Sequence, residues 1–184
     1  MNQLIHLHNS LFSKLERADW MLPTLARILF AAVLLVYYWN SGLTKLGEGL
    51  TGLFQPSAGA YAQILPRIFE AAGYDTSALS VFHRLVVLGG TWAEFLLPAL
   101  IVLGLASRLA ALGMIGFVLL QSLTDIIGHH ADAATIGGWF DRFEGSAILD
   151  QRSLWVLLLL VIVVKGGGPF SADRLLARRF GSEM

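Results

Sequence analysis

The sequence predicts an all-α polytopic membrane protein: a four-transmembrane-helix bundle with an N-terminal amphipathic surface helix. Its composition and its apolar segments predict this fold class. Of its 184 residues, 55% are hydrophobic and 14% are charged, whereas soluble domains are about 25% charged. The mean hydropathy is +0.65. Four segments approach the roughly 20 apolar residues that cross a bilayer core, so most of the chain is expected to contact lipid.

The first element is expected within residues 1–20, as a cytoplasmic amphipathic helix on the membrane surface. Its apolar side chains recur near helical spacing: Leu4, Leu7, Leu11, Phe12 and Leu15. No small-residue cleavage site follows an early apolar segment, so this stretch is not typical of a signal peptide. A second surface helix is expected in the long connection after the first span, over residues 60–72 with an interruption at Pro66.

Four spans are expected within residues 21–176, followed by a basic cytoplasmic tail over 177–184. They cover about 23–44, 81–104, 108–128 and 150–167. The second and third spans are separated by only a few residues, which predicts an antiparallel hairpin. The fourth apolar run, residues 153–164, is short for a span. Arg152 and Lys165 are therefore expected to snorkel at its two ends.

The distribution of basic residues predicts the orientation of the chain. Four spans place both termini on one side. The tails and the short loop carry eight basic residues: Lys14, Arg17, Arg27, Arg108, Lys165, Arg174, Arg178 and Arg179. The two long loops and their edges carry five: Lys45, Arg67, Arg84, Arg142 and Arg152. Because basic residues favour the inner side, both termini are expected in the cytoplasm and the long loops on the outer side of the membrane.

Charge and cysteine content exclude several classes of function. Thirteen basic residues balance thirteen acidic residues, so no overall positive field would attract nucleic acid. The chain has no cysteine. Disulfides, thiol nucleophiles and cysteine-ligated metal centres are therefore excluded. The lipid bilayer is the first expected partner, and nucleic acid is not expected.

Three groups of residues resemble the DoxX-like family of small four-helix bacterial membrane proteins, over nearly all of residues 23–176. The first span combines an early Arg27 with a Gly-x-x-Lys ending at residues 42–45. The second carries an intramembrane Glu94 and leads to Gly104 and Arg108. The sequence after the fourth span, GGGPFSAD at residues 166–173, is similar to the family's Gly-Pro-Gly-x-x-Ser-x-Asp motif. It departs from that motif at two positions. Gly167 stands where the motif has its proline, and a proline follows two residues later, at Pro169.

The resemblance implies more about fold than about activity. Members of this family are membrane subunits of quinone-linked redox systems, or membrane partners of soluble redox or detoxifying proteins. The glycine-rich exit motif is typical of a helix end and a membrane-surface anchor. A quinone is therefore the expected cofactor. A protein partner would have to supply the electrons, because the chain has neither cysteine nor a nucleotide-binding motif.

Glu94 is the residue that points most strongly to chemistry. A carboxylate in the middle of a span is costly to insert and is a functional candidate by default. With a raised pKa it could exchange protons with a bound quinone. Alternatively, it only binds another helix, for example through Asn40 or Lys45 of the first span. Arg27 and Lys45, near the two ends of that span, are interpreted as anchors rather than catalysts.

Three histidines are expected at one outer membrane edge, because the second span begins at His83 and the third ends before His129 and His130. Besides the histidines, this predicted pocket contains Arg84, Trp92, Asp125, Asp132 and Trp139. Glu94 and Asp125 are the predicted catalytic residues, and the histidines, Arg84 and the two tryptophans the predicted cofactor-binding residues. A metal on His129 and His130, or haem between His83 and His129, are weaker alternatives. An ordinary group of solvated loop residues explains the pattern as well.

Three hypotheses of function remain open. The leading one is a subunit of a quinone-linked redox system, possessing oxidoreductase activity only within that system. The alternative is a non-catalytic anchor or scaffold that docks a soluble periplasmic or redox partner on its outer loops. The third is transport through the bundle, which four spans would support only as a homo-oligomer. Acidic and basic residues near the third loop, including Asp141, Glu144 and Asp150, would contact such a partner or simply face solvent.

Overall fold

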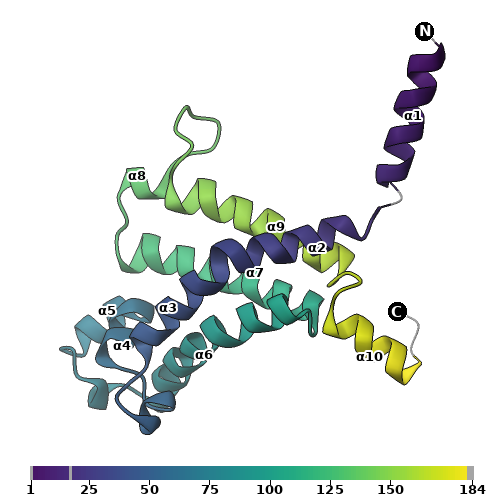
Figure 1. The fold of residues 1–184 in the computed structure, drawn as a ribbon. Coiled ribbons are helices and arrows are strands. Elements are labelled where there is room, and N and C mark those ends of the chain that lie inside the picture. Colours follow the sequence, from purple (N-terminus) through teal and green to yellow (C-terminus); the bar gives the residue numbers. More distant parts are fainter. Residues whose placement is uncertain (1, 17, 182–184) are drawn as a thin grey trace.

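The computed structural model describes residues 2–16 and 18–181, and these residues form helices and no strands. Four helical stretches are long and apolar enough to cross a membrane: Met21–Lys45, Val81–Leu103, Ser107–Gly128 and Ala147–Lys165. The prediction of an all-α chain with four such helices is confirmed. This is the architecture of a multi-pass membrane protein. Figure 1 shows the four stretches packed side by side.

The first span is one continuous helix with a wider turn in its middle. It consists of α2 (Met21–Phe30), the π-helical turn η1 (Ala31–Leu35) and α3 (Val36–Lys45). Pro23 is tolerated because the first turn of a helix needs no backbone donor. The helix ends at Lys45, where Leu46 turns extended with a ψ of 143°.

The second and third spans form the predicted hairpin. The Ser80 side chain accepts a hydrogen bond from the backbone N–H of His83 and begins α6 (Val81–Leu103). Gly104, with a φ of +69°, ends it, as glycine does at many helix ends. Helix α7 (Ser107–Leu123) then begins and continues into the π-helical turn η4 (Thr124–Gly128).

The fourth span starts and ends earlier than the sequence predicts. Instead of residues 150–167, it covers the π-helical turn η5 (Ala147–Gln151) and α9 (Arg152–Lys165). It begins early because the Ser146 side chain accepts a hydrogen bond from the N–H of Asp150 and caps the first turn. It ends at Lys165 because Gly166 has a φ of +78°.

Short helices fill the two long connections. The connection between α3 and α6 contains η2 (Leu50–Leu53), α4 (Ala58–Ile64), α5 (Pro66–Ala71) and η3 (Thr76–Ala78). The interruption expected at Pro66 separates α4 from α5. A small apolar cluster that includes Ala60, Tyr61 and Phe69 packs these helices against Val87 of α6. The other connection contains the single turn α8 (Ala133–Ile136).

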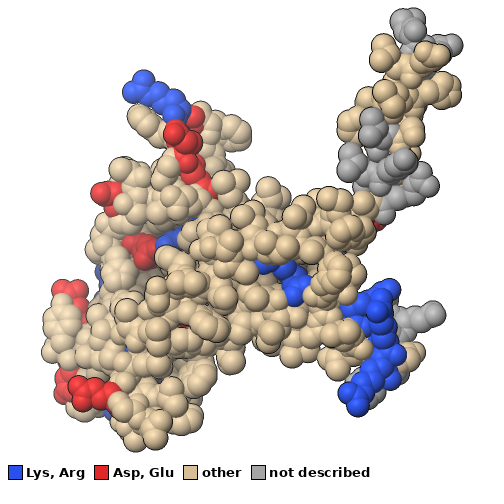
Figure 2. Space-filling view, viewed as in Figure 1, with Lys and Arg blue, Asp and Glu red and all other residues tan. Residues whose placement is uncertain are grey.

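The main core lies where the four spans meet. Its fully buried side chains come from all four spans and include Phe30, Leu34, Ile101, Met114 and Leu159. Most other large apolar side chains of the spans are exposed, and Figure 2 shows a largely uncharged surface along the middle of the molecule, with only a few charged side chains in it. Lipid rather than water suits such a surface.

Both termini lie at one end of the bundle and both long connections at the other (Figure 1). Below, these are the terminal end and the loop end. Helix α1 (Asn2–Glu16) stands away from the spans and leaves apolar side chains exposed, among them Leu4, Leu7 and Phe12. Helix α10 (Ala172–Phe180) carries the basic cluster at the terminal end in Figure 2. Arg17 lies outside the described residues. The bilayer-surface position of α1 stays a prediction.

Candidate functional site

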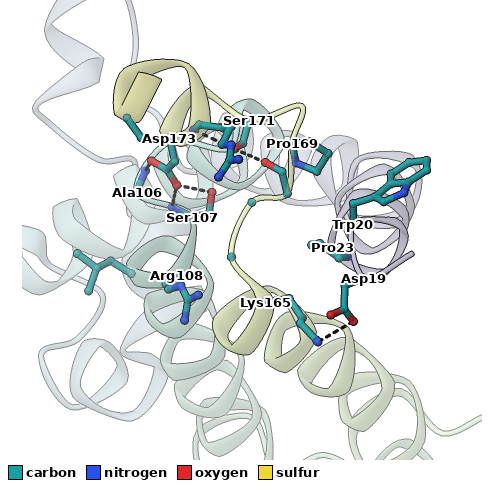
Figure 3. A pocket seen from close by; sticks show the side chains of 16 residues that line it. Asp19, Trp20, Pro23, Ala106, Ser107, Arg108, Lys165, Pro169, Ser171 and Asp173 are labelled. Atoms are coloured by element: carbon teal, nitrogen blue, oxygen red, sulfur yellow. Dashed lines mark hydrogen bonds and ion pairs between the residues drawn. The ribbon is translucent and has the colours of Figure 1, made fainter. Parts of the chain in front are cut away.

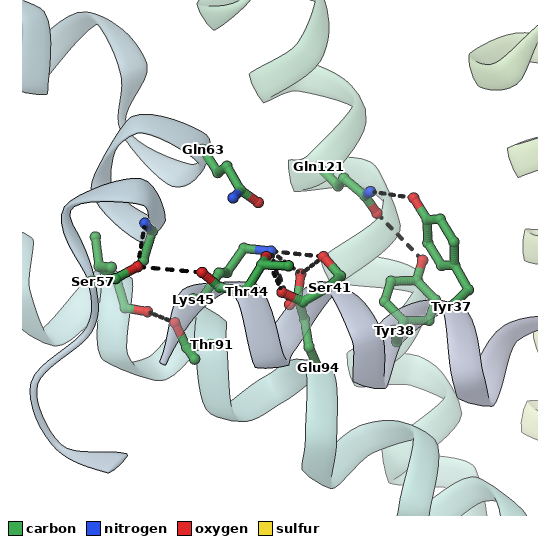
Figure 4. Close-up of polar contacts among 12 residues, drawn as sticks. Tyr37, Tyr38, Ser41, Thr44, Lys45, Ser57, Gln63, Thr91, Glu94 and Gln121 are labelled. Atoms are coloured by element: carbon green, nitrogen blue, oxygen red, sulfur yellow. Dashed lines mark hydrogen bonds and ion pairs between the residues drawn. The ribbon is translucent and has the colours of Figure 1, made fainter. Parts of the chain in front are cut away.

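A buried ion pair joins the first two spans near the loop end. Nζ of Lys45, the last residue of α3, lies 3.0 Å from each carboxylate oxygen of Glu94 on α6. The two side chains are only 4% and 5% exposed. Figure 4 shows Ser41 beside them: its hydroxyl accepts a hydrogen bond from Lys45 and donates one to Glu94. Ser41 and Lys45 reach the same carboxylate because residues four apart share a helix face.

Of the two partners considered for Glu94, the structure places Lys45 beside it and not Asn40. The glutamate lies inside the bundle, where its charge is neutralised by an ammonium group and its oxygens accept three hydrogen bonds. Breaking such a pair is costly, yet replacing it whole by apolar residues is often neutral. Lys45 is thus a partner of Glu94 inside the bundle rather than an anchor at its edge.

Aromatic hydroxyls and an amide continue the polar contacts toward the third span. The hydroxyl of Tyr38 donates to Oε1 of Gln121 over 3.3 Å, and the amide of Gln121 donates to the hydroxyl of Tyr37 over 3.2 Å (Figure 4). Trp155 of α9 packs against both tyrosine rings. From their place in the first span, the sequence predicts Tyr37 and Tyr38 in an outer aromatic belt at the membrane interface; in the structure Tyr37 is partly exposed, whereas Tyr38 is fully buried.

A second ion pair corrects the prediction for Arg152. Its guanidinium does not snorkel outward but lies 2.6 Å from the carboxylate of Asp125, with its side chain 9% exposed. A second nitrogen donates to Ser122 over 3.1 Å, while Nε has no partner among the described residues. Asp125 on η4, predicted as catalytic, is therefore the counter-ion of Arg152. Lys165 does lie at the surface, where it pairs with Asp19 over 3.0 Å.

The histidines of the predicted outer pocket have separate, local partners. A ring nitrogen of His83 lies 3.1 Å from the hydroxyl of Ser80, and one of His129 lies 3.1 Å from the carbonyl of Gln63. His130 is exposed and has a φ of +54°. Within the described part of the chain, no group of three histidine and acidic side chains is arranged to hold a metal ion.

The remaining predicted binding residues also contact nearby backbone. Arg84 donates to the carbonyl of Thr76, Trp92 donates to that of Leu53, and Trp139 donates to that of Leu149. No hydrogen bond or ion pair among the described residues joins any two of the predicted cofactor-binding side chains. Asp132 accepts from the backbone and side chain of Thr135, and these hydrogen bonds lower its pKa. The structure thus spreads these residues over several turns and helix ends.

At the terminal end, Arg27 joins three spans. Its guanidinium donates to the carbonyls of Ile101 and Val102 at the end of α6, and to those of Gly167 and Phe170 after α9. It neither snorkels nor forms a hydrogen-bonded ion pair. The anchor interpretation of Arg27 is refined: it satisfies carbonyls at helix ends, which would otherwise lack partners.

Asp173 completes this arrangement at the start of α7. Its carboxylate accepts hydrogen bonds from the backbone N–H groups of Ala106 and Ser107 and from the Ser107 hydroxyl, over 2.7–2.8 Å. Partial burial opposes ionisation of Asp173, but these hydrogen bonds outweigh it and lower its pKa. A Cβ on Gly167 would lie 2.4 Å from the Ser107 hydroxyl, so only glycine permits this approach. The exit motif therefore joins the end of the fourth span to the first span and to the start of the third.

A cavity of about 600 Å³ lies beside this closure, between α2, α7, α9 and α10 (Figure 3). Basic side chains of Arg108, Lys165 and Arg174 line it together with the glycines of residues 166–168. None of the predicted site residues lines this cavity. The sequence signal that could have found it is the convergence of basic residues at the ends of three helices.

Comparison with protein-family models, curated proteins and solved structures finds no match for this chain. The resemblance to the DoxX-like family therefore stays a prediction based on the motifs quoted above.

Proposed function

We propose that this membrane protein is a non-catalytic scaffold that docks a soluble protein partner on the loop of residues 137–146, here named the docking loop. The observation that carries the proposal is Phe140, which is fully exposed and has a φ of +65°. A bulky residue rarely adopts this conformation, and such strain is found mainly at functional positions. The docking loop projects from the loop end of the bundle (Figure 1).

Contacts within and beside the docking loop restrain two of its aromatic residues, Trp139 and Phe143. The indole N–H of Trp139 donates to the carbonyl of Leu149 over 3.0 Å. Asp141 accepts from the backbone N–H of Phe143 over 2.8 Å, and the Arg142 guanidinium lies 4.9 Å from the Phe143 ring centre. Because these groups are already ordered, a partner would bind them at a low cost in conformational entropy.

The charges between the aromatic rings favour a protein partner over lipid. Asp141, Arg142 and Glu144 are exposed beside Phe140 and Phe143, and Figure 2 shows side chains of both signs on this projection. Acidic groups are repelled by an anionic membrane surface. Exposed aromatic residues combined with arginine are typical of the residues that dominate protein–protein binding.

The buried pair of Lys45 and Glu94 further supports a non-catalytic role, because the two side chains bind each other rather than facing a ligand site. A quinone head group at Glu94 would need a free carboxylate oxygen, or free donors on Lys45, facing a space for the ring. Both oxygens of Glu94 accept hydrogen bonds from Lys45, and both side chains are almost fully buried. As arranged, these residues do not fit a quinone, and we derive no proton transfer through Glu94.

The docking proposal can be tested by site-specific crosslinking in the native host. A photoreactive phenylalanine analogue at Phe140 is expected to give one discrete protein adduct. The matched control carries the analogue at Phe82, another exposed phenylalanine, at the start of α6, and should not give that adduct. The charge reversals Asp141→Lys and Glu144→Lys should abolish it, while the double variant Lys45→Met/Glu94→Leu, which removes both buried charges together, should leave it unchanged. Adducts with lipid alone, or no loss on charge reversal, would refute the docking proposal.

The quinone-linked redox role implied by the resemblance is the second candidate; it would require the Lys45–Glu94 pair to open, so that an ionisable group inside the membrane span could reach the quinone. Under this role, Glu94→Gln and His129→Ala would abolish quinone-dependent turnover while the Phe140 adduct persists. Such a result would replace the scaffold proposal by the redox one.

A further inference from the structure

The cavity at the terminal end is formed by parts of the chain that are far apart in sequence. Trp20 and Pro23 come from the start of the first span, Arg108 from the first turn of α7, Lys165 from the end of α9 and Arg174 from α10. Figure 3 shows the side chains of Trp20, Pro23, Arg108 and Lys165 around one opening. At about 600 Å³ the cavity is large enough for a polar head group with part of an apolar chain.

The cavity is lined by more basic side chains than free carboxylates. Lys165 is paired with Asp19 at the surface. The carboxylate of Asp173 is occupied by the start of α7. Within the described residues, no carboxylate lies within ion-pair distance of Arg108 or Arg174. One nitrogen of Arg108 donates to the carbonyl of Val163 over 3.2 Å, but neither arginine charge is neutralised by a carboxylate, so both charges are available to an anion.

The three glycines of residues 166–168, which also line the cavity, add a backbone donor to it. The carbonyl of Gly167 accepts from Arg27 over 2.8 Å. In a trans peptide the following N–H points the opposite way, so the N–H of Gly168 is directed away from Arg27. No acceptor among the described residues takes that N–H. Gly166 packs against the guanidinium of Arg108, since a Cβ there would lie 3.4 Å from its Nε.

The position of the cavity suits a lipid better than a free anion. It opens at the ends of membrane-spanning helices, where lipid head groups lie. Trp20, which is half exposed, has the amphipathic ring that favours the membrane interface. Leu109 lines the cavity and also faces outward from α7, so apolar surface runs from the cavity to the lipid-facing side of the bundle.

We propose that this cavity binds an anionic phospholipid, whose phosphate contacts Arg108 and Arg174 and whose acyl chains lie along Leu109 and the apolar side of α7. Guanidinium groups bind phosphate through paired, charge-assisted hydrogen bonds. Basic pockets between membrane helices bind anionic head groups in this way. The site lies at the opposite end of the bundle from the docking loop and does not depend on the scaffold proposal.

The test is native mass spectrometry of the full-length protein in detergent, titrated with phosphatidylglycerol or with zwitterionic phosphatidylcholine. Wild-type protein is expected to retain phosphatidylglycerol selectively. Arg108→Gln combined with Arg174→Gln should weaken that retention about tenfold or more, because each basic residue contributes substantially at a membrane surface. The matched control, Arg178→Gln with Arg179→Gln, removes the same charge from α10 at residues that do not line the cavity. It should change retention less than twofold.

Two outcomes would overturn the proposal. An equal loss in both double variants would mean general attraction to the basic end of the protein rather than a site. Complete displacement of the lipid by excess inorganic phosphate would mean a site for the free anion.

A second measurement does not depend on the arginine variants. Brominated phosphatidylglycerol should quench the fluorescence of Trp20, so Trp20→Phe should remove part of the quenching seen in the wild-type protein. Quenching that is unchanged by Trp20→Phe would also contradict a lipid in this cavity.

Discussion

At the scale of single residues, the protein places its buried charges next to groups that neutralise them. Lys45 and Glu94 form one such pair, and Arg152 and Asp125 form another. Water cannot solvate these groups inside the bundle, so each charge depends on its partner. The two pairs therefore specify which faces of the spans meet, because sliding or rotating a helix would separate them.

The Lys45–Glu94 pair leads to a prediction about stability. Glu94→Gln leaves the Lys45 ammonium buried without a counter-ion and should destabilise the protein by about 3–5 kcal/mol. The double variant Lys45→Met/Glu94→Leu removes both charges and should recover most of that loss. Equilibrium unfolding in mixed detergent micelles measures both.

The exposed pair of Asp19 and Lys165 provides the control for this measurement. Its side chains are 72% and 39% exposed, so Asp19→Asn should change stability by only about 0–1 kcal/mol. A double variant at residues 45 and 94 that is no more stable than Glu94→Gln would show that the charge itself is not the source of the cost.

The sequence predicted part of this residue-scale chemistry. That Glu94 needs a partner followed from its place in an apolar span, and Lys45 was one of two partners considered. The burial of Arg152 could not be predicted, because it depends on Asp125 of another helix lying beside it. The predicted grouping of histidines assumed that residues at one membrane edge converge. In the structure His129 lies against the carbonyl of Gln63 and His83 against the hydroxyl of Ser80, so each of these two has a partner of its own.

At the scale of helices, the ends of the spans depend on contacts with distant segments. Ala106 precedes α7 with a φ of +47°, a strained value for a residue other than glycine. Its N–H and that of Ser107 bind Asp173, which follows the fourth span. The start of the third span is therefore stabilised from beyond the end of the fourth.

The Asp173 contact predicts a dependence on pH. Because the folded protein lowers the pKa of Asp173, its contribution to stability is present above the unfolded-state pKa of about 4 and is lost as the pH falls through the lower folded-state value. At pH 7, Asp173→Asn should destabilise the protein by about 0.5–2 kcal/mol, as the loss of a helix cap does. Thermal melting of both proteins should show this difference shrinking toward pH 3. A difference that stays constant over that range would contradict the assignment.

The existence of the helices was easier to predict than their ends. An apolar run of sufficient length predicts a span whatever its neighbours are. The wider π-helical turns at residues 31–35 and 147–151 leave no clear mark in an apolar sequence, because they change which face a residue lies on without changing its polarity. The early start of the fourth span likewise depends on the cap at Ser146.

At the scale of the whole molecule, the charge distribution and the shape agree with a bundle that crosses the membrane between its terminal end and its loop end. The largely uncharged surface separates a basic terminal end from the loop end (Figure 2). The structure places both termini at one end, which follows from four spans. Which side of the membrane that end faces stays a prediction from the distribution of basic residues.

This orientation can be measured directly because the chain has no cysteine. Single cysteines replacing Phe140 in the docking loop and Gly181 after α10 should react with a membrane-impermeant maleimide from opposite sides. With intact bacterial cells, we expect labelling at position 140 only, and labelling at position 181 only after the membrane is opened. Labelling of both positions in intact cells would contradict the four-span topology, and the reverse pattern would contradict the cytoplasmic termini.

The contacts of Arg27 have a consequence for how the protein is synthesised and inserted. Arg27 enters the membrane with the first span, but two of its carbonyl partners, Gly167 and Phe170, are made only after the fourth. Until then its guanidinium must stay hydrated or be held by the insertion machinery. Residues made after the fourth span thus complete a contact begun by the first span, and in a nascent chain cut short before Gly167 the guanidinium of Arg27 would lack two of its four carbonyl partners.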